Sequence, residues 1–196
     1  MVVKDLIMAI KMSLENLDME YCTLMQIDYS KIVSDSLRED LAKKKYLERP
    51  FAYEFHHQIR KLIDDGEVDF GGPIVQAEID KKHQHCFENG KIPDFIIYIP
   101  NINRNLGVIE FRLASNPRRI EYDLEKLAEF RRDLGYAYVI EAIIGSKASL
   151  KDVKKRLTQL SKPEGEKIMI VEFDIDSWKV VAGMIGYVDD PHLTSL

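Results

Sequence analysis

The sequence has little cysteine, no long apolar run and no excess of basic residues. Only two of its 196 residues are cysteines, Cys22 and Cys86, too few for a disulfide framework and suited to a reducing interior. No run approaches the ~20 apolar residues of a membrane span, and no basic-then-apolar start has the pattern of a signal peptide. We therefore expect a cytoplasmic protein that does not bind membranes.

The charge balance also limits the partners. The formal net charge is −5, although charged residues make up 31% of the chain. Bulk electrostatics of this sign repels a polyanion rather than attracting it. Any binding of nucleic acid must therefore use a local basic patch or metal ions.

The length and the 45% hydrophobic content fit one domain with a sizeable core. We find neither an internal repeat nor a low-complexity linker. The sequence predicts a single domain over 1–196. It divides into an N-terminal helical extension (1–47), a core (48–175) and a C-terminal edge segment (176–196).

The first part of the chain has helical periodicity. Apolar residues recur at spacings of three and four, which predicts one buried helical stripe: Val3, Leu6, Ile7, Ile10, Leu14 and Leu17. We expect a second helix over 35–46, with Lys43-Lys44-Lys45 as a solvated face in preference to a DNA contact. A third helix begins near Pro50, carries Glu54 and ends at Asp64-Asp65-Gly66.

After Gly71-Gly72-Pro73 the pattern becomes strand-like. We expect strands over 74–80, 94–99 and 106–113, joined by short polar connections that favour an antiparallel meander. Glu78 and Asp80 share one face of the first strand. That face is either an exposed polar surface or part of a cleft with Asp94.

The second half alternates helices and strands. Asn116-Pro117 begins a helix, followed by a strand over 137–144, a helix over 150–160, a strand over 167–173 and an edge segment over 178–188. A meander followed by a βαβ crossover predicts an α/β fold. Its mixed sheet is flanked by helices, with extra helices at the N-terminus.

Two acidic residues, Asp94 and Glu110, are carried by neighbouring strands sixteen positions apart (110 − 94). Alternation along the second of these strands directs Glu110 and Arg112 to one face and Phe111 to the core. Carboxylate oxygens are ligands for Mg²⁺ or Mn²⁺, and such a metal can activate water beside a phosphate. Arg112 is a candidate to clamp the phosphate or the attacking water.

Pro93-Asp94 followed by Glu110-Phe111-Arg112 resembles the motif of the PD-(D/E)XK nuclease superfamily, which has a restriction-endonuclease-like core. The resemblance implies a metal-dependent nuclease in which Asp94 and Glu110 bind Mg²⁺ or Mn²⁺. It adds Glu54 as a further acid and nucleic acid as the partner, DNA ahead of RNA. Three segments resemble a bacterial and archaeal group of that superfamily: Glu48-Arg49-Pro50-Phe51, Gln76-Ala77-Glu78-Ile79-Asp80-Lys81 and Asp123-Leu124-Glu125-Lys126-Leu127.

The sequence departs from the superfamily at Arg112, where the usual residue is lysine. Arginine keeps the positive charge but stays protonated, so it cannot shuttle a proton. The protein is therefore either an active nuclease or a catalytically degenerate member that binds nucleic acid or a protein partner. A third reading makes Asp94, Glu110 and Arg112 a buried ion network without a ligand.

Other residues extend or limit the site. Glu78 is a candidate third metal ligand, and Arg118, Arg119 and Lys126 are candidate phosphate contacts, with solvated surface as the alternative for the arginines. His83-Gln84-His85-Cys86 lacks the second ligand pair of a zinc site and is read as a polar turn. The apolar face of the first helix makes a homodimer possible.

Overall fold

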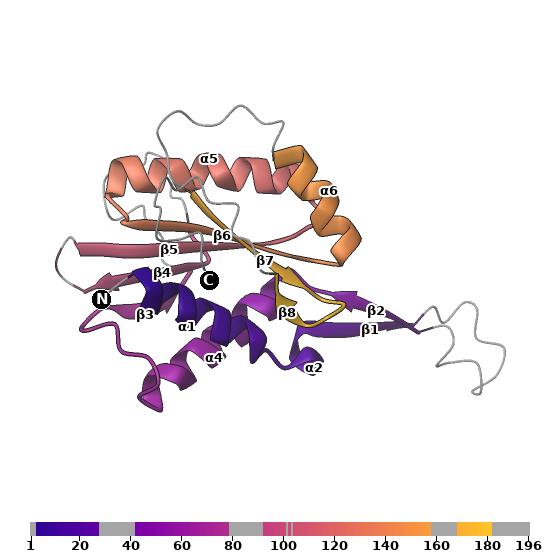
Figure 1. Ribbon diagram of the computed structural model, residues 1–196, viewed down its shortest axis with the longest axis horizontal. Coiled ribbons are helices and arrows are strands. Elements are labelled where there is room, and N and C mark those ends of the chain that lie inside the picture. Colours follow the sequence, from indigo (N-terminus) through magenta and orange to yellow (C-terminus); the bar gives the residue numbers. More distant parts are fainter. Residues whose placement is uncertain are drawn as a thin grey trace.

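The computed structural model describes residues 3–27, 42–78, 92–100, 102, 104–157 and 168–181. These residues form a six-stranded mixed sheet with helices on both faces, and a separate two-stranded hairpin projects from this body (Figure 1). The α/β class, the mixed sheet and the N-terminal helix predicted from the sequence are confirmed.

The elements occur in the chain as follows. The helices are α1 (Val3–Glu15), α2 (Met19–Cys22), α4 (Glu48–Asp64), α5 (Pro117–Leu134) and α6 (Lys147–Leu157). The strands are β1 (Thr23–Ile27), β2 (Ala42–Tyr46), β3 (Ile74–Ala77), β4 (Phe95–Ile99), β5 (Arg104–Leu113), β6 (Tyr138–Gly145), β7 (Ile168–Asp174) and β8 (Lys179–Val180).

The strands of the large sheet follow one another in chain order, from β3 to β8. β3, β4 and β5 are antiparallel, β5, β6 and β7 are parallel, and β8 returns antiparallel to β7. The antiparallel meander and the βαβ crossover are thus both as predicted. α5 connects β5 to β6, and α6 connects β6 to β7.

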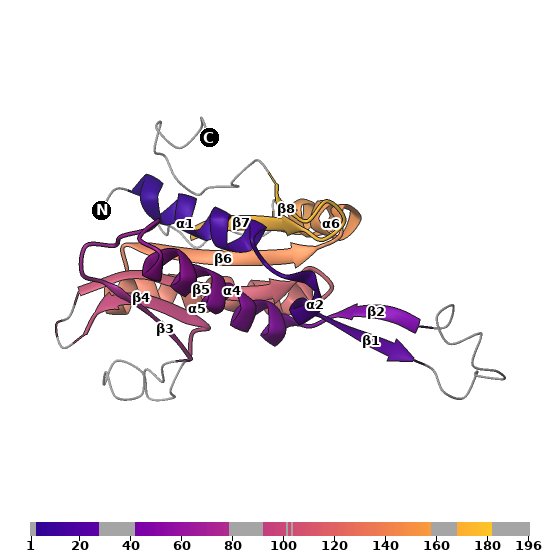
Figure 2. The same cartoon turned by 90° about the horizontal axis from the view of Figure 1, so that it is seen from below.

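The helices cover the sheet in two layers. α1 and α4 lie on one face, and α5 and α6 lie on the other (Figures 1 and 2). β5 contributes to both cores: Ile109 and Phe111 pack beneath α4, and Val108 packs beneath α5. The ring of Phe111 lies 4.9 Å from that of Phe55 on α4. The predicted alternation therefore holds, and it directs Glu110 and Arg112 to the α5 face.

The apolar stripe of α1 is used inside the molecule. Leu6, Ile10 and Leu14 are at most 1% exposed and belong to the core that α4 shares with the sheet. The apolar face of α1, which made a homodimer possible on sequence grounds, is therefore covered by other parts of the same chain. Among the described residues, no helix is both long and apolar enough to cross a membrane.

The helix predicted over 35–46 is wrong for residues 42–46, the part of that range that the structure describes. Residues 42–46 form β2, which pairs with β1, and Thr23 lies opposite Tyr46. The remainder of that prediction lies outside the described residues. Lysines and alanine favour helices locally, but strand pairing and the packing of Tyr46 on Phe51 and Trp178 prevail here.

Other boundaries differ from the predictions by a few residues. β3 ends at Ala77, and Glu78 leaves the strand with a positive φ of 49°. α4 begins at Glu48 rather than at Pro50, and α5 begins at Pro117 as predicted. Asp80, the polar turn at 83–86 and most of the edge segment lie outside the described residues.

Candidate functional site

Four acidic residues occupy one row across the large sheet. The Glu78 N–H, just past β3, donates to the Asp94 carbonyl at 2.9 Å. Asp94 immediately precedes Phe95, which pairs with Ile109. In this antiparallel register Asp94 therefore lies opposite Glu110. Glu110 in turn pairs with Glu141 on β6. Residues opposite each other on paired strands share a face, so the register gathers carboxylates in one place.

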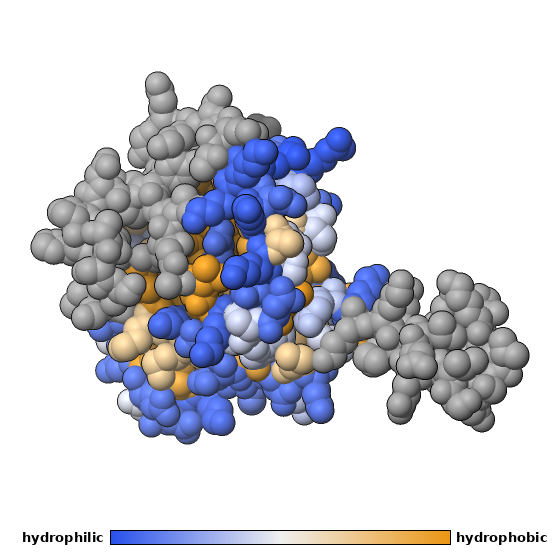
Figure 3. All heavy atoms as spheres, turned by 45° about the vertical axis from the view of Figure 1, so that its right-hand side comes forward, coloured by the Kyte–Doolittle hydropathy of each residue, from blue (hydrophilic) through white to orange (hydrophobic). Residues whose placement is uncertain are grey.

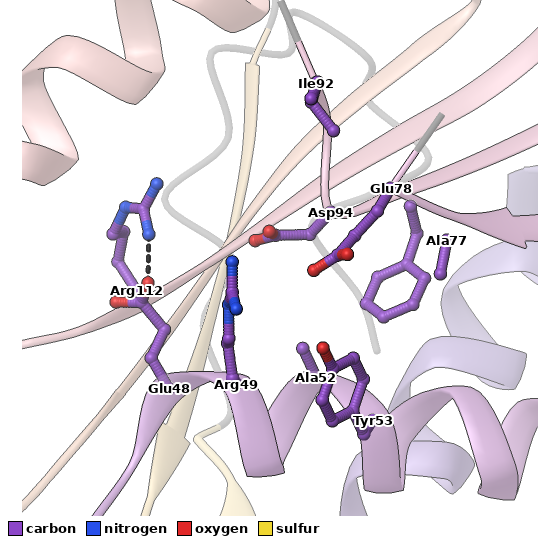
Figure 4. Close-up of a pocket in the computed structure, with 10 residues that line it drawn as sticks. Glu48, Arg49, Ala52, Tyr53, Ala77, Glu78, Ile92, Asp94 and Arg112 are labelled. Atoms are coloured by element: carbon purple, nitrogen blue, oxygen red, sulfur yellow. Dashed lines mark hydrogen bonds and ion pairs between the residues drawn. The ribbon is translucent and has the colours of Figure 1, made fainter. Parts of the chain in front are cut away.

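A cavity of about 320 Å³ opens at the Glu78 and Asp94 end of this row, between the start of α4, the end of β3 and the start of β4. In Figure 4 the Asp94 and Glu78 carboxylates point into it, and Arg49 reaches toward them from α4. The lining residues are Glu48, Arg49, Ala52, Tyr53, Ala77, Glu78, Ile92, Asp94, Phe95 and Arg112. The structure thus brings together three predicted site residues, Asp94, Arg112 and Glu78.

Asp94 is held by the strand beside it. Its Oδ2 accepts a hydrogen bond from the Phe111 N–H at 2.7 Å. Burial raises the pKa of Asp94, and that hydrogen bond and the charge of Arg112 oppose the shift. The carboxylate is therefore fixed at the cavity in a position set by the β4–β5 pairing.

Glu110 is fully buried behind Asp94. Its Oε1 lies 2.6 Å from Nζ of Lys126, and its Oε2 lies 3.9 Å from the Arg112 guanidinium. Oε2 has no hydrogen-bond donor among the described residues. Burial, together with the charge on Asp94, raises the pKa of Glu110 to about 8 against the pull of Lys126. Oε2 is thus an acceptor that a proton or a cation would satisfy.

Lys126 reaches the acids from α5. Its side chain is 9% exposed, and Nζ also donates to the Ile92 carbonyl at 3.2 Å. The sequence grouped Lys126 with Arg118 and Arg119 as phosphate contacts, but the structure separates them. The two arginines are exposed on the first turn of α5 and do not line the cavity, whereas Lys126 lies against Glu110.

Arg112 is held by carboxylates on both sides. Its guanidinium makes two contacts with Asp123, one of them from Nη2 at 3.2 Å, and a further contact with Glu48. Asp123 is fully buried. Burial alone would lower the pKa of Arg112, but the hydrogen bonds and charge of Asp123 raise it above its usual value. Arg112 therefore ties α4, β5 and α5 together, and these contacts occupy the donors that a phosphate clamp would use.

Glu54 does not reach this cavity. Its Oε1 accepts hydrogen bonds from the Gln58 side chain at 2.7 Å and from the Asp18 N–H at 3.4 Å. It therefore fastens the start of α2 to α4. The acid that α4 presents to the cavity is Glu48, at the start of the helix.

Sequence reasoning did not assign roles to Glu48, Arg49, Asp123 or Glu141. The first three lie in segments that carried the family resemblance, so a signal was present for them. Glu141 interrupts an otherwise apolar strand, Tyr138–Gly145. A lone acid in such a strand is itself a signal, because burying it without a partner is costly.

Glu141 is the innermost acid of the row. It is fully buried, and neither carboxylate oxygen has a hydrogen-bond partner among the described residues. Burial raises its pKa well above the usual value, and the charges of Asp123 and Glu110 add to the shift. Burial without a partner thus favours the protonated form of Glu141.

The donor set fits a hard cation. No group of three or more His, Cys, Asp or Glu side chains within the described residues is arranged to hold a metal ion. Mg²⁺, however, usually takes one or two carboxylates and completes its shell with water and phosphate oxygens. Asp94 and the unpartnered Oε2 of Glu110 supply that number of ligands.

The structure establishes a mixed α/β fold with a cavity lined by acidic and basic side chains at the start of β4. Neither a protein-family model nor a curated protein matches the sequence.

Proposed function

We propose that the protein is a metal-dependent phosphodiesterase that cleaves nucleic acid, DNA ahead of RNA, with the restriction-endonuclease-like core of the PD-(D/E)XK superfamily. One observation carries the proposal. Asp94 lines the cavity, its strand register places it opposite the buried Glu110 on the adjacent antiparallel strand, and Nζ of Lys126 lies 2.6 Å from Oε1 of Glu110. Two carboxylates can hold a metal ion that activates water, and a lysine beside them can stabilise the charge that develops on a phosphodiester.

Asp94 and Oε2 of Glu110 would hold Mg²⁺ or Mn²⁺, and Glu78 is the nearby acid available to a further ligand position. A metal bound there lowers the pKa of its water and neutralises charge on the phosphate. Because the pKa of Glu110 is about 8, this residue must release a proton before it can act as a ligand near neutral pH.

Lys126 supplies a lysine ammonium group beside the acids, where the superfamily motif has a lysine and this sequence has Arg112. Its ammonium group is compact, has three donors and lies at Glu110. It can orient the attacking water and stabilise charge on the phosphate. Arg112 then has a positioning role, because its contacts with Asp123 and Glu48 fix α5 and α4 around the cavity.

Arg49 is the residue best placed to bind the substrate phosphate. It is exposed, lines the cavity and has no ion pair with another described residue. The guanidinium fork matches phosphate oxygens in a bidentate manner. Arg49 reaches from α4 toward Asp94 (Figure 4), so its positive charge would lie beside a phosphate bound to the proposed metal.

A second candidate function is a degenerate site that binds nucleic acid or a protein partner without hydrolysis. It is favoured by the engagement of Arg112 with Asp123 and Glu48, and by the lack of a three-ligand metal group in the described residues. In this case the Lys126–Glu110 ion pair would be a permanent structural contact.

The experiment is a calorimetric titration of Mg²⁺ and Mn²⁺ into wild type, Asp94→Asn and Glu110→Gln, with plasmid DNA, single-stranded DNA and RNA incubated in parallel. We expect wild type to bind metal and cleave DNA. Both variants should lose metal affinity and at least ~100-fold of the cleavage rate. Glu54→Gln is the matched control, because Glu54 is a buried acid of α4 outside the cavity; it should behave as wild type.

Undiminished cleavage by Asp94→Asn would overturn the proposal. Metal binding by wild type without cleavage of any substrate would favour the degenerate site. If wild type bound no metal, Asp94 and Glu110 would not form the proposed centre.

A further inference from the structure

The cavity at the candidate site has two chemically different sides. One side is formed by charged residues, among them Arg49 and Arg112. The other includes Ala52, Tyr53 and Ala77, which lie away from Arg112 in the view of Figure 4. The two alanines carry only methyl groups, so they leave space beside the Tyr53 ring. The cavity therefore suits a ligand that joins a charged part to a flat, weakly polar part.

Tyr53 gives this side of the cavity an exposed aromatic ring. The residue is 53% exposed, whereas the described side chains on the face drawn in Figure 3 are mainly hydrophilic. Single exposed apolar side chains are ordinary on protein surfaces, so exposure alone does not indicate a site. What distinguishes Tyr53 is its place in a cavity with charged residues that suit a phosphate. A ring in that place offers a face on which a flat group can stack.

Arg49 and Tyr53 lie on the same side of α4. They are four positions apart (53 − 49) in a continuous helix, so their side chains are neighbours on its surface, one turn of about 5.4 Å apart. Both are exposed and both line the cavity. A nucleotide joins its phosphate to its base through one sugar, which also keeps the two groups only a few ångströms apart. An arginine for the phosphate and a ring for the base are therefore spaced as a single nucleotide requires.

We infer that Tyr53 stacks on the base of an unpaired nucleotide whose phosphate lies at Arg49, so that the substrate is a single-stranded nucleic acid. The inference rests on the proposed function for the position of the phosphate. Bases in a duplex are paired and stacked on one another, so a side chain cannot reach their faces, whereas a single strand presents them. Stacking on an aromatic side chain tolerates every base, because each base has a π-face. Tyr53 therefore selects for unpaired strands without reading their sequence.

An ordinary surface role for Tyr53 gives a different expectation. Removal of its ring would then affect nucleic-acid binding no more than removal of another exposed tyrosine. Tyr122 is the matched control, because it is 51% exposed, lies on α5 and does not line the cavity. The two explanations therefore differ in a measurable way.

The test measures binding of three fluorescent DNAs by anisotropy: a 20-nucleotide single strand, the same strand with abasic sites in place of its nucleosides, and the corresponding duplex. Ca²⁺ replaces Mg²⁺ as a cation that also takes oxygen ligands, and gels establish that the strands stay intact. Wild type should bind the single strand more tightly than the duplex.

Tyr53→Ala should bind the single strand at least ~5-fold more weakly than wild type, the loss expected for one stacked base. It should bind the abasic strand as wild type does, because that strand keeps its phosphates and has no base to stack. Tyr53→Phe keeps the ring and should resemble wild type on both strands, as should Tyr122→Ala. Circular dichroism establishes that each variant is folded.

Equal binding of the single strand by wild type and Tyr53→Ala would overturn the inference, as would an equal loss on the abasic strand or in Tyr122→Ala. Preference of wild type for the duplex would overturn it as well. Cleavage assays with Mn²⁺ separate this inference from the proposed function. Tyr53-dependent binding by a wild type that cleaves none of the DNAs would refute the proposed function and leave the stacking role of Tyr53 standing. Cleavage that is lost in Asp94→Asn, with binding and cleavage unchanged in Tyr53→Ala, would do the reverse.

Discussion

Arg112 and Lys126 approach the same group of acids but have different surroundings. Arg112 contacts Asp123 and Glu48, which belong to different helices, whereas Lys126 contacts Glu110, one of the two proposed metal ligands. A planar guanidinium suits the bidentate contact with Asp123, and an ammonium group suits a compact site beside water and phosphate. Under the proposed function, Arg112 therefore has a positioning role, and the cation that acts at the site is Lys126 from the neighbouring helix.

This division predicts opposite outcomes for two variants. Lys126→Ala should remain folded, because Glu110 can take up a proton when its partner is lost, and cleavage should fall by ~10²–10³. Arg112→Ala should lower the free energy of unfolding by about 3–5 kcal/mol, because the buried Asp123 loses its two guanidinium contacts and keeps only Lys126, whose Nζ lies 4.0 Å away. Urea unfolding and a cleavage assay on both proteins measure the two effects.

Conservative variants provide the controls. Lys126→Arg should recover little activity, because the larger planar group does not fit the same position. Arg112→Lys should recover only part of the stability, because lysine cannot make the fork contact with Asp123. An increase in cleavage in Arg112→Lys would show instead that the missing catalytic cation belongs on β5, and it would contradict the role of Lys126.

At the scale of elements, the sequence correctly predicts those helices and strands whose own residues mark a start, an end or an alternation of faces. α5 has proline at its first position and Gly135 at its C-cap with a φ of 65°, which favours glycine. β5 alternates so that Phe111 and Glu110 face opposite sides. β2 has no such signal, because a lysine run is compatible with a helix and only its pairing with β1 makes it a strand.

The site was predictable to the extent that strand order determined it. Asp94 and Glu110 were found because residues on paired antiparallel strands meet in register. The resemblance pointed to Glu54, whereas the acid of α4 that lines the cavity is Glu48, because the sequence does not say which side of a helix faces a cleft. Six residues turn an α-helix by about 600°, which leaves the two side chains roughly 120° apart.

The junction of β5 and β6 with the helices that follow gives a prediction of its own. A Cβ at Gly145 would lie 2.5 Å from Cβ of Ala114, and the Ala114 N–H donates to the Ile144 carbonyl at 2.8 Å. Gly145→Ala should therefore force β5 and β6 apart and lower the free energy of unfolding by about 1–3 kcal/mol. Chemical denaturation gives the value.

Gly107→Ala is the matched control for this substitution. A Cβ at Gly107, within β5, would find its nearest atom at 3.6 Å, an ordinary contact with Ile97. Its stability should stay within about 1 kcal/mol of wild type. Equal losses in the two variants would mean that the close approach of Ala114 does not govern the effect at Gly145, because the entropy of the unfolded chain favours alanine over glycine at both positions.

For the molecule as a whole, the buried acids of the row, together with Glu172 on β7, make folding depend on protons. Burial raises the pKa of Asp94, Glu110, Glu141 and Glu172 in the folded state. Between their ordinary values and the raised ones, the folded protein binds more protons than the unfolded chain. The free energy of unfolding must then fall as pH rises through this window, which for Glu110 extends from 4.5 to about 8.

We therefore expect the metal-free protein to be more stable at pH 5.5 than at pH 8.5, with a melting temperature lower by at least ~5 °C at the higher pH. Glu141→Gln should flatten this dependence, because glutamine keeps the shape of the neutral acid and cannot ionise. Mg²⁺ or Mn²⁺ should restore stability mainly at high pH, where Glu110 is ionised and binding favours the folded state. Scanning calorimetry of both proteins across this range, with metal and with EDTA, measures each effect. A melting temperature that rose with pH in EDTA would mean that the row keeps its negative charges in the folded protein, with cations rather than protons balancing them.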